Sequence, residues 1–118
     1  MKILVTDDSK AMRMIVTRHI RQSGIDVTEI KEAGNGVEGL AAMEGWTPDL
    51  ILSDWNMPEM SGIEFIRKLR EMGNNVKFGF VTSEGTEEMR KMAHDAGALF
   101  LIAKPFTVDV FRQALANI

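Results

Sequence analysis

Short apolar runs alternate with helical repeats five times along this chain of 118 residues. The runs at residues 2–6, 50–54, 76–81 and 99–103 have the length of buried strands, and turn or helix-start residues follow each one. A further run at 27–33 carries charges, which is typical of an edge strand. Strands joined through helices run parallel and are covered on both faces. The pattern therefore predicts a doubly wound α/β fold, with a five-stranded parallel sheet as the middle layer of a three-layer sandwich.

The segments between the runs have the spacing of amphipathic helices. Asn35 with Glu38 and Ser61 with Glu64 have the spacing of capping boxes. We interpret the methionines of the third and fourth helices as core residues. The predicted inward faces are Met12, Ile15, Val16, His19 and Ile20, ended by Ser23 and Gly24; Val37, Leu40 and Ala41; Phe65, Ile66, Leu69 and Met72; Met89, Met92, Ala93 and Ala96 after a Thr86 cap, ended by Gly97; and Val108, Phe111, Ala114, Leu115 and Ile118 after a Thr107 cap, in a helix that finishes the chain.

Length and composition limit the classes of function. We expect one domain over residues 1–118, because the chain is too short for two ordinary cores. It has no apolar run long enough for a membrane span, and its N-terminus does not resemble a secretory signal, so we expect a cytoplasmic protein. The absence of cysteine excludes thiolate metal sites and Cys nucleophiles. A net charge of −3 gives no sign of nucleic-acid binding and favours a protein or a small ligand as partner.

Polar residues stand at the carboxyl ends of four of the five predicted strands. They are Asp7 and Asp8, Asp54, Thr82 and Lys104. In an open α/β sheet these ends share one edge, so the side chains can meet in a single crevice. Three carboxylates in one crevice repel one another unless a cation neutralises them, and oxygen donors without His or Cys favour Mg²⁺. A backbone carbonyl in the Trp55–Asn56 turn could add a ligand.

This set of groups has the composition of a phosphoryl site. Asp54 would be the nucleophile that forms an aspartyl phosphate, with Lys104 and the Thr82 hydroxyl facing the anionic group. Taken singly, each residue has a simpler explanation: an acidic pair often caps a helix, Thr often ends a strand in a turn, and Lys is usually a surface residue. Asp54 is harder to explain that way, since it ends an apolar strand. The coincidence of all these groups at strand ends supports the phosphoryl site.

These motifs resemble the receiver domains of two-component response regulators, and especially the single-domain chemotaxis members of that family. The resemblance covers essentially the whole chain. It rests on the motifs Asp7-Asp8, Ser53-Asp54-Trp55-Asn56-Met57-Pro58, Ser61-Gly62, Thr82-Ser83 and Lys104-Pro105. It implies a flavodoxin-like fold with strand order 2-1-3-4-5 and a cis bond before Pro105.

The resemblance also implies roles for single residues. Asp54 would be the phosphoacceptor, and Asp7 and Asp8 the metal pair that binds Mg²⁺ together with Asp54. The backbone carbonyl of Asn56 would be a further metal ligand. Thr82 would sense the phosphoryl group, and Lys104 would be the conserved-type lysine.

The partners implied are a sensor histidine kinase, bound near the first helix, and a downstream target protein bound on the face of helix four, strand five and helix five. Asn56 and Glu84 would tune the lifetime of the phosphoryl group. We therefore predict a stand-alone, phosphoaccepting signalling protein that assists its own phosphorylation and dephosphorylation and is not an enzyme in the usual sense.

One position departs from the family pattern. Many receivers have Tyr or Phe three residues before the lysine, where this chain has Leu101. Phe100 is adjacent, but neighbouring strand residues point to opposite faces, so it does not replace that aromatic. Either Leu101 repacks with a smaller signal, or helix four responds through the loop at residues 83–85.

Three other functions compete with this interpretation. A Mg²⁺-dependent phosphatase or mutase also uses an aspartyl phosphate, but typically has an aspartate where this chain has Asn56. A phosphorylation-independent interaction module does not require the complete acidic set. A flavin-binding protein of the same fold would bind phosphate near Asp7 and Asp8, whose charges repel it.

Overall fold

A parallel sheet with helices on both faces forms the protein, as a computed structural model describes it for residues 1–116 and 118. The strand order is β2-β1-β3-β4-β5, which confirms the predicted fold class and order. In chain order the elements are β1 (Lys2–Thr6), α1 (Lys10–Gln22), β2 (Glu29–Ala33), α2 (Gly36–Ala42), β3 (Leu50–Ser53), α3 (Gly62–Glu71), β4 (Lys77–Thr82), α4 (Glu87–Asp95), β5 (Phe100–Ala103) and α5 (Val108–Leu115). Within the described residues, no helix has the length and apolar character needed to cross a membrane.

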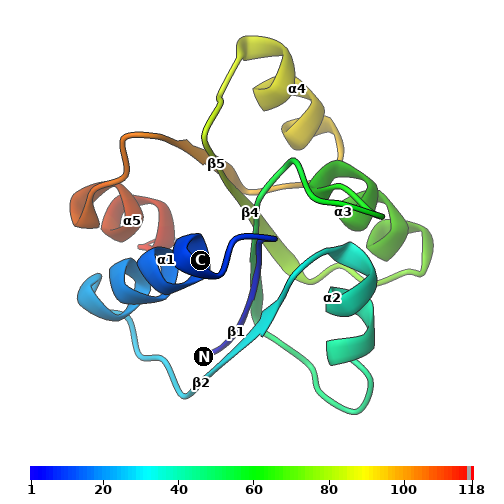
Figure 1. Cartoon of the computed structure of the whole chain (residues 1–118), viewed down its shortest axis with the longest axis horizontal. Helices are drawn as coiled ribbons and strands as arrows, with labels where there is room; N and C mark the ends of the chain where they lie inside the picture. Colours follow the sequence, from blue (N-terminus) through cyan, green and yellow to red (C-terminus); the bar gives the residue numbers. More distant parts are fainter. Residues whose placement is uncertain (117) are drawn as a thin grey trace.

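Two helix layers cover the sheet (Figure 1). Helices α1 and α5 lie on one face, where Phe111 packs against the β1 and β3 side chains that point to that side. Helices α2, α3 and α4 cover the other face, where Phe65, Phe78 and Phe80 form an aromatic cluster. Since both faces of β1 and β3 are covered, these strands are apolar almost throughout, as expected for central parallel strands.

The register of the sheet brings the ends of four strands to one edge. Thr6 at the end of β1 pairs with Ser53 at the end of β3. At the end of β4, Thr82 pairs with Ala103 of β5. Residues that follow β1, β3 and β5 therefore leave the sheet beside one another, together with Thr82.

Side-chain caps begin the helices much as the sequence predicts. Ser61 and Glu64 form the expected reciprocal capping box of α3, and the hydroxyls of Thr86 and Thr107 cap α4 and α5. The side chain of Asn35 accepts a hydrogen bond from Glu38 N–H, but the Glu38 carboxylate accepts from the N–H of Gly34, not that of Asn35. The capping box predicted at α2 therefore forms only in part: the Asn35 cap is present, but the carboxylate of Glu38 bonds the N–H one residue before Asn35.

Some residues expected on inward helix faces are exposed. Ile15 is 37% exposed, Val37 47% and Met72 61%, and Ala41 is also exposed. The rest of the predicted inward residues are buried or half-buried. The buried stripe of a surface helix is narrow, and residues at its margin satisfy the sequence spacing without reaching the core. Met72 is in addition the C-cap of α3, where the helix ends.

The strand boundaries differ from the prediction by one or two residues, and β5 differs in character. β2 begins at Glu29 instead of residue 27, β3 ends at Ser53, and β4 is displaced by one residue. The run at 99–103 was expected to be buried on both faces, but β5 is an edge strand in which only Ile102 is buried. An apolar run does not reveal whether a strand has one neighbour or two.

The predicted last helix also differs from the structure. It was expected to finish the chain, but α5 ends at Leu115. Ile118 still packs against the core beside α5. Asn117, which the predicted helix includes, lies outside the described residues.

Candidate functional site

Three carboxylates converge where β1 and β3 leave the sheet. Asp7, Asp8 and Asp54 each offer an oxygen atom, and these atoms lie within 4.8 Å of one another. Asp7 is only 5% exposed, Asp54 is half-buried and Asp8 is exposed. The strand-end prediction is therefore confirmed as geometry: residues 46 or more positions apart in the chain share one acidic cluster, because β1 and β3 are neighbours in the sheet.

Backbone and hydroxyl contacts hold Asp54 on three sides. Its N–H donates to the carbonyl of Thr6 at 2.8 Å, which extends the β1–β3 pairing by one residue. Its carbonyl accepts from the Ser53 hydroxyl at 2.8 Å. Its Oδ1 accepts from the N–H of Trp55 at 2.7 Å. The carboxylate therefore has a defined orientation before any ligand binds.

Asp7 is fixed in a similar way at the end of β1, through both its main chain and its side chain. Its N–H donates to the carbonyl of Ala33 at 3.0 Å, and its Oδ1 accepts from Ser9 N–H at 2.8 Å. The Ser9 hydroxyl in turn caps α1 by accepting from Met12 N–H. One short turn thus ends β1, positions two carboxylates and begins α1.

Burial and mutual repulsion make this cluster costly to ionise. Burial is the largest cause that raises the pKa of Asp7 to about 6, and the charges of Asp54 and Asp8 add to it. Burial likewise raises the pKa of Asp54, with a further contribution from Asp8. The hydrogen bond from Trp55 N–H opposes that rise, as do the nearby Thr82 hydroxyl and Asn56 N–H. A cation between the carboxylates would relieve the repulsion.

The other predicted site residues occupy different places around the carboxylates. Thr82 and Lys104 line the same pocket of about 250 Å³ as Asp7, Asp8 and Asp54. Over the part of the chain that the structure describes, however, Lys104 makes no ion pair with a carboxylate. Asn56 is exposed and does not line the pocket, although its N–H faces Asp54. The bond between Lys104 and Pro105 is cis, as the family resemblance implies.

The donor set fits Mg²⁺. Three carboxylates from two strand ends supply hard oxygen ligands, which is the ligand class that Mg²⁺ prefers, and no His or Cys lines the pocket. The raised pKa values of Asp7 and Asp54 are a second indication, since a divalent cation would stabilise their ionised forms. Asp7, Asp8 and Asp54 would hold the ion.

Sequence reasoning missed two contributors to this site. Gly62, noted only as part of a motif, packs its α-carbon against the main chain of Asp54, and its N–H donates to the carbonyl of Trp55 at 2.8 Å. Arg13 of α1 donates to the carbonyl of Asp7 at 2.6 Å. The spacing of apolar residues carries no signal for either contact, because both depend on how separate elements pack.

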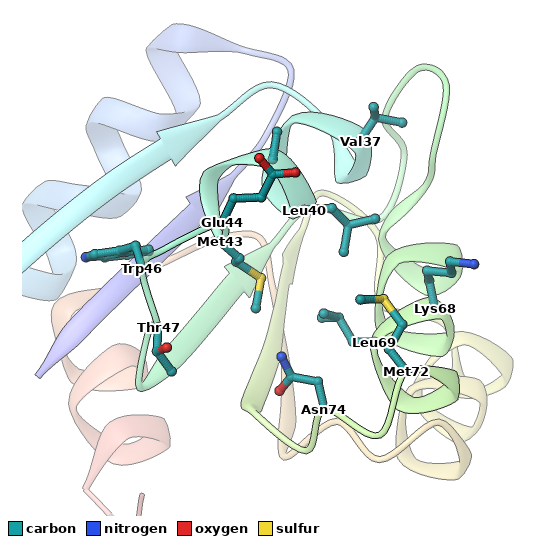
Figure 2. A pocket seen from close by; sticks show the side chains of 11 residues that line it. Val37, Leu40, Met43, Glu44, Trp46, Thr47, Lys68, Leu69, Met72 and Asn74 are labelled. Carbon is teal, nitrogen blue, oxygen red and sulfur yellow. The ribbon is translucent and has the colours of Figure 1, made fainter.

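A larger hollow lies elsewhere in the described residues. It measures about 610 Å³ and lies between α2 and α3, with Leu40, Met43, Leu69 and Met72 pointing into it (Figure 2). Its lining is mostly apolar and holds neither the carboxylate cluster nor Lys104. We place the chemistry in the smaller acidic pocket, because the one group of three carboxylates able to hold a metal ion among the described residues lies there, beside Lys104.

Comparison with known proteins agrees with this geometry. A model of the family described as the response regulator receiver domain matches residues 3–116. The chain belongs to the response regulator receiver family. Receiver domains are signalling proteins that interact with sensor kinases and downstream targets, so membership favours that role over the phosphatase and flavin-binding interpretations.

Individual relatives point the same way. The chain is 33% identical to a probable chemotaxis protein CheY of Rhizobium etli, over 97% of this chain and 88% of the relative. It is 31% identical to the sporulation initiation phosphotransferase F of Bacillus subtilis, over 97% and 90%. The structure of the chemotaxis protein CheY4 of Vibrio cholerae superposes with a TM-score of 0.85 at 29% identity, covering 99% of this chain and 97% of that one.

The departure at Leu101 is visible in the packing of this receiver domain. Leu101 belongs to the core on the α2–α4 side, and Phe100 to the core on the α1–α5 side. The ring of Phe100 lies over Gly79, where a Cβ would come within 2.3 Å of it. Phe100 therefore does not take the place of the usual aromatic, as the alternation of strand side chains predicts.

Proposed function

We propose that this receiver domain accepts a phosphoryl group on Asp54 from the phosphohistidine of a sensor histidine kinase, in a step that depends on Mg²⁺. The observation that carries the proposal is the convergence of Asp7, Asp8 and Asp54 within 4.8 Å, in a pocket that Thr82 and Lys104 also line. Such a cluster has no evident structural use, since it raises the pKa of two of its own members.

The proposed step uses residues whose placement suits in-line transfer. An oxygen of Asp54, oriented by the hydrogen bond from Trp55, attacks phosphorus while the bond to the histidine nitrogen breaks. Bound Mg²⁺ would supply charge neutralisation for the phosphoryl oxygens. Lys104, which lines the pocket, would move toward the new anion, and the Thr82 hydroxyl would donate to it. The backbone carbonyl of Asn56 is proposed as a further metal ligand, and Asn56 and Glu84 as residues that tune hydrolysis.

Signalling would then occur through altered protein binding by the receiver domain of residues 1–118. We propose the face of α4, β5 and α5 as the target surface, on which Leu99 and Val110 are exposed apolar residues. The kinase would bind nearer α1, where Met14 and Ile15 are exposed. Phosphorylation would shift the population toward a conformer that binds the target. The names of several relatives favour a chemotaxis target, and that of the sporulation phosphotransferase favours onward phosphoryl transfer.

Trp55 offers a direct test, since its ring packs 4.7 Å from Phe80 and its N–H contacts Asp54. The second tryptophan, Trp46, lies under Lys31 and donates to Glu29, so it would add an unrelated signal. The titration should therefore use the Trp46→Phe variant, first with Mg²⁺ and then with acetyl phosphate. We expect a saturable fluorescence change at each step, and a mass increase of one phosphoryl group in the second.

Two comparisons make this test decisive. In Asp54→Ala on the same background, the acetyl phosphate response and the mass increase should both vanish. A response to acetyl phosphate that survives this substitution would refute the role of Asp54. Repeated turnover of a phosphorylated substrate, without accumulation of phosphoprotein, would support the phosphatase interpretation instead.

A further inference from the structure

One arginine ties the acidic turn to the neighbouring edge strand. Nη1 of Arg13, in the first turns of α1, donates to the main-chain carbonyl of Asp7 at 2.6 Å. Nε of the same side chain donates to Oε1 of Glu32 in β2 at 2.8 Å. The Arg13 side chain is mostly buried, with 18% exposed, whereas Glu32 is 45% exposed. A planar guanidinium that bonds two partners in fixed directions has little freedom left.

The carbonyl that Arg13 holds belongs to the peptide that links the two acidic residues. Since that peptide is planar, fixing its oxygen fixes the direction in which the chain passes from Asp7 to Asp8. Asp7 N–H, in the preceding peptide, is bonded to the carbonyl of Ala33 in β2, so both peptide units that flank the Asp7 α-carbon are held. Both anchors lead to β2 and to α1, and neither touches a carboxylate of the cluster.

We infer that Arg13 is a positioning residue: its bond to the Asp7 carbonyl holds the Asp7 and Asp8 carboxylates at the separation from Asp54 that binds a divalent cation. The inference rests on the proposed function, because it concerns the same metal site. Partners that orient metal ligands typically change metal affinity by 10- to 100-fold when they are removed.

Electrostatics predicts an effect of the opposite sign, which makes the inference testable. Removal of a positive charge near three carboxylates should by itself strengthen the binding of Mg²⁺. If Arg13 acts through position, Arg13→Met, which keeps the aliphatic stem and loses the donors, should weaken binding by about 10-fold. Lys10→Met is the matched control, since it removes the same charge from the start of α1 at an exposed residue with no bond to the turn.

The experiment measures the dissociation constant of Mg²⁺ from Trp55 fluorescence in the Trp46→Phe background, with a thermal melt of each variant in EDTA. We expect weaker binding in Arg13→Met, partial recovery in Arg13→Lys, and equal or tighter binding in Lys10→Met. Equal or tighter binding in Arg13→Met, or a loss of metal-free stability with no change in affinity, would overturn the inference. No Mg²⁺ response in the parent protein would instead refute the proposed function, so the two failures are distinguishable.

Discussion

The carbonyl oxygen of Asp54 lies so close to the α-carbon of Gly62 that a Cβ at position 62 would approach it to 2.1 Å. The ring of Phe80 would lie 2.8 Å from that Cβ. Glycine is therefore needed where α3 begins, because the backbone that carries the acidic residue passes directly over it. The start of α3 and the proposed phosphoacceptor are packed as one unit.

Gly62→Ala should consequently lower the free energy of unfolding by about 2 kcal/mol, as overpacking of a tight site does. Alanine is favoured over glycine in helices by only about 1 kcal/mol, which is too little to compensate. Relief of the clash must move the Asp54 main chain, so Mg²⁺ binding should weaken as well. Urea unfolding and a Trp55 fluorescence titration would measure the two effects.

Gly34→Ala is the control for this substitution. The three atoms nearest to its Cβ would all belong to the flexible carboxyl end of Glu38, the first at 3.2 Å, so we expect little change in stability or metal binding. A Gly62→Ala protein that is as stable as the parent and binds Mg²⁺ equally well would contradict the packing argument.

Asp7→Asn should stabilise the metal-free protein. Burial raises the pKa of Asp7 to about 6, whereas an unfolded chain has a value near 3.9. Between these values the folded state binds the proton on Asp7 more tightly than the unfolded chain does. The contribution of this group to stability is therefore fully present below about pH 4 and is lost as the pH rises through about 6. At pH 7.5 in EDTA, Asn should raise the free energy of unfolding by roughly 1–3 kcal/mol and should flatten its dependence on pH.

Melts in EDTA at pH 5 and pH 7.5 would test this expectation, with Asp26→Asn as the control. Asp26 is exposed, and its carboxylate makes no hydrogen bond among the described residues. Equal slopes of stability against pH in the parent and in Asp7→Asn would show that the pKa of Asp7 is not raised by folding.

Mg²⁺ binding should weaken as the pH falls below about 6. The metal requires ionised carboxylates, so the proton on Asp7 must leave before the ion can bind. Affinity should be nearly constant above that pH and fall by about 10-fold for each unit below it. Calorimetric titrations at pH 5 and 7.5 would measure the change, and an affinity that is the same at both values would contradict it.

The sequence predicted the elements well because local spacing specifies them, and it predicted the cluster because parallel strands end at a common edge. The prediction of the site required only the correct strand ends and the strand order that the family resemblance supplied. It covers Asp7, Asp8, Asp54, Thr82 and Lys104. The exposure of β5 does not follow from its apolar run, since it depends on the lack of a second neighbour, and only the strand order implied by the family resemblance indicates that lack. The contacts of Gly62 and Arg13 were invisible for a related reason: each involves main-chain atoms of another element, and side-chain patterns do not report main-chain approach.

Leu101→Ala should separate stability from chemistry at the position where the family usually has an aromatic. Leu101 is half-buried against the aromatic core and does not line the acidic pocket. Truncation should cost about 2 kcal/mol, toward the low end for leucine because the site is only half-buried. Because Leu101 does not line the pocket, the rate of labelling by acetyl phosphate should stay within about twofold of the parent rate. A factor of two corresponds to a change of only about 0.4 kcal/mol in the barrier. Mass spectrometry would follow labelling, with Asp54→Ala as the negative control, and a large fall in the labelling rate would show that Leu101 supports the site directly.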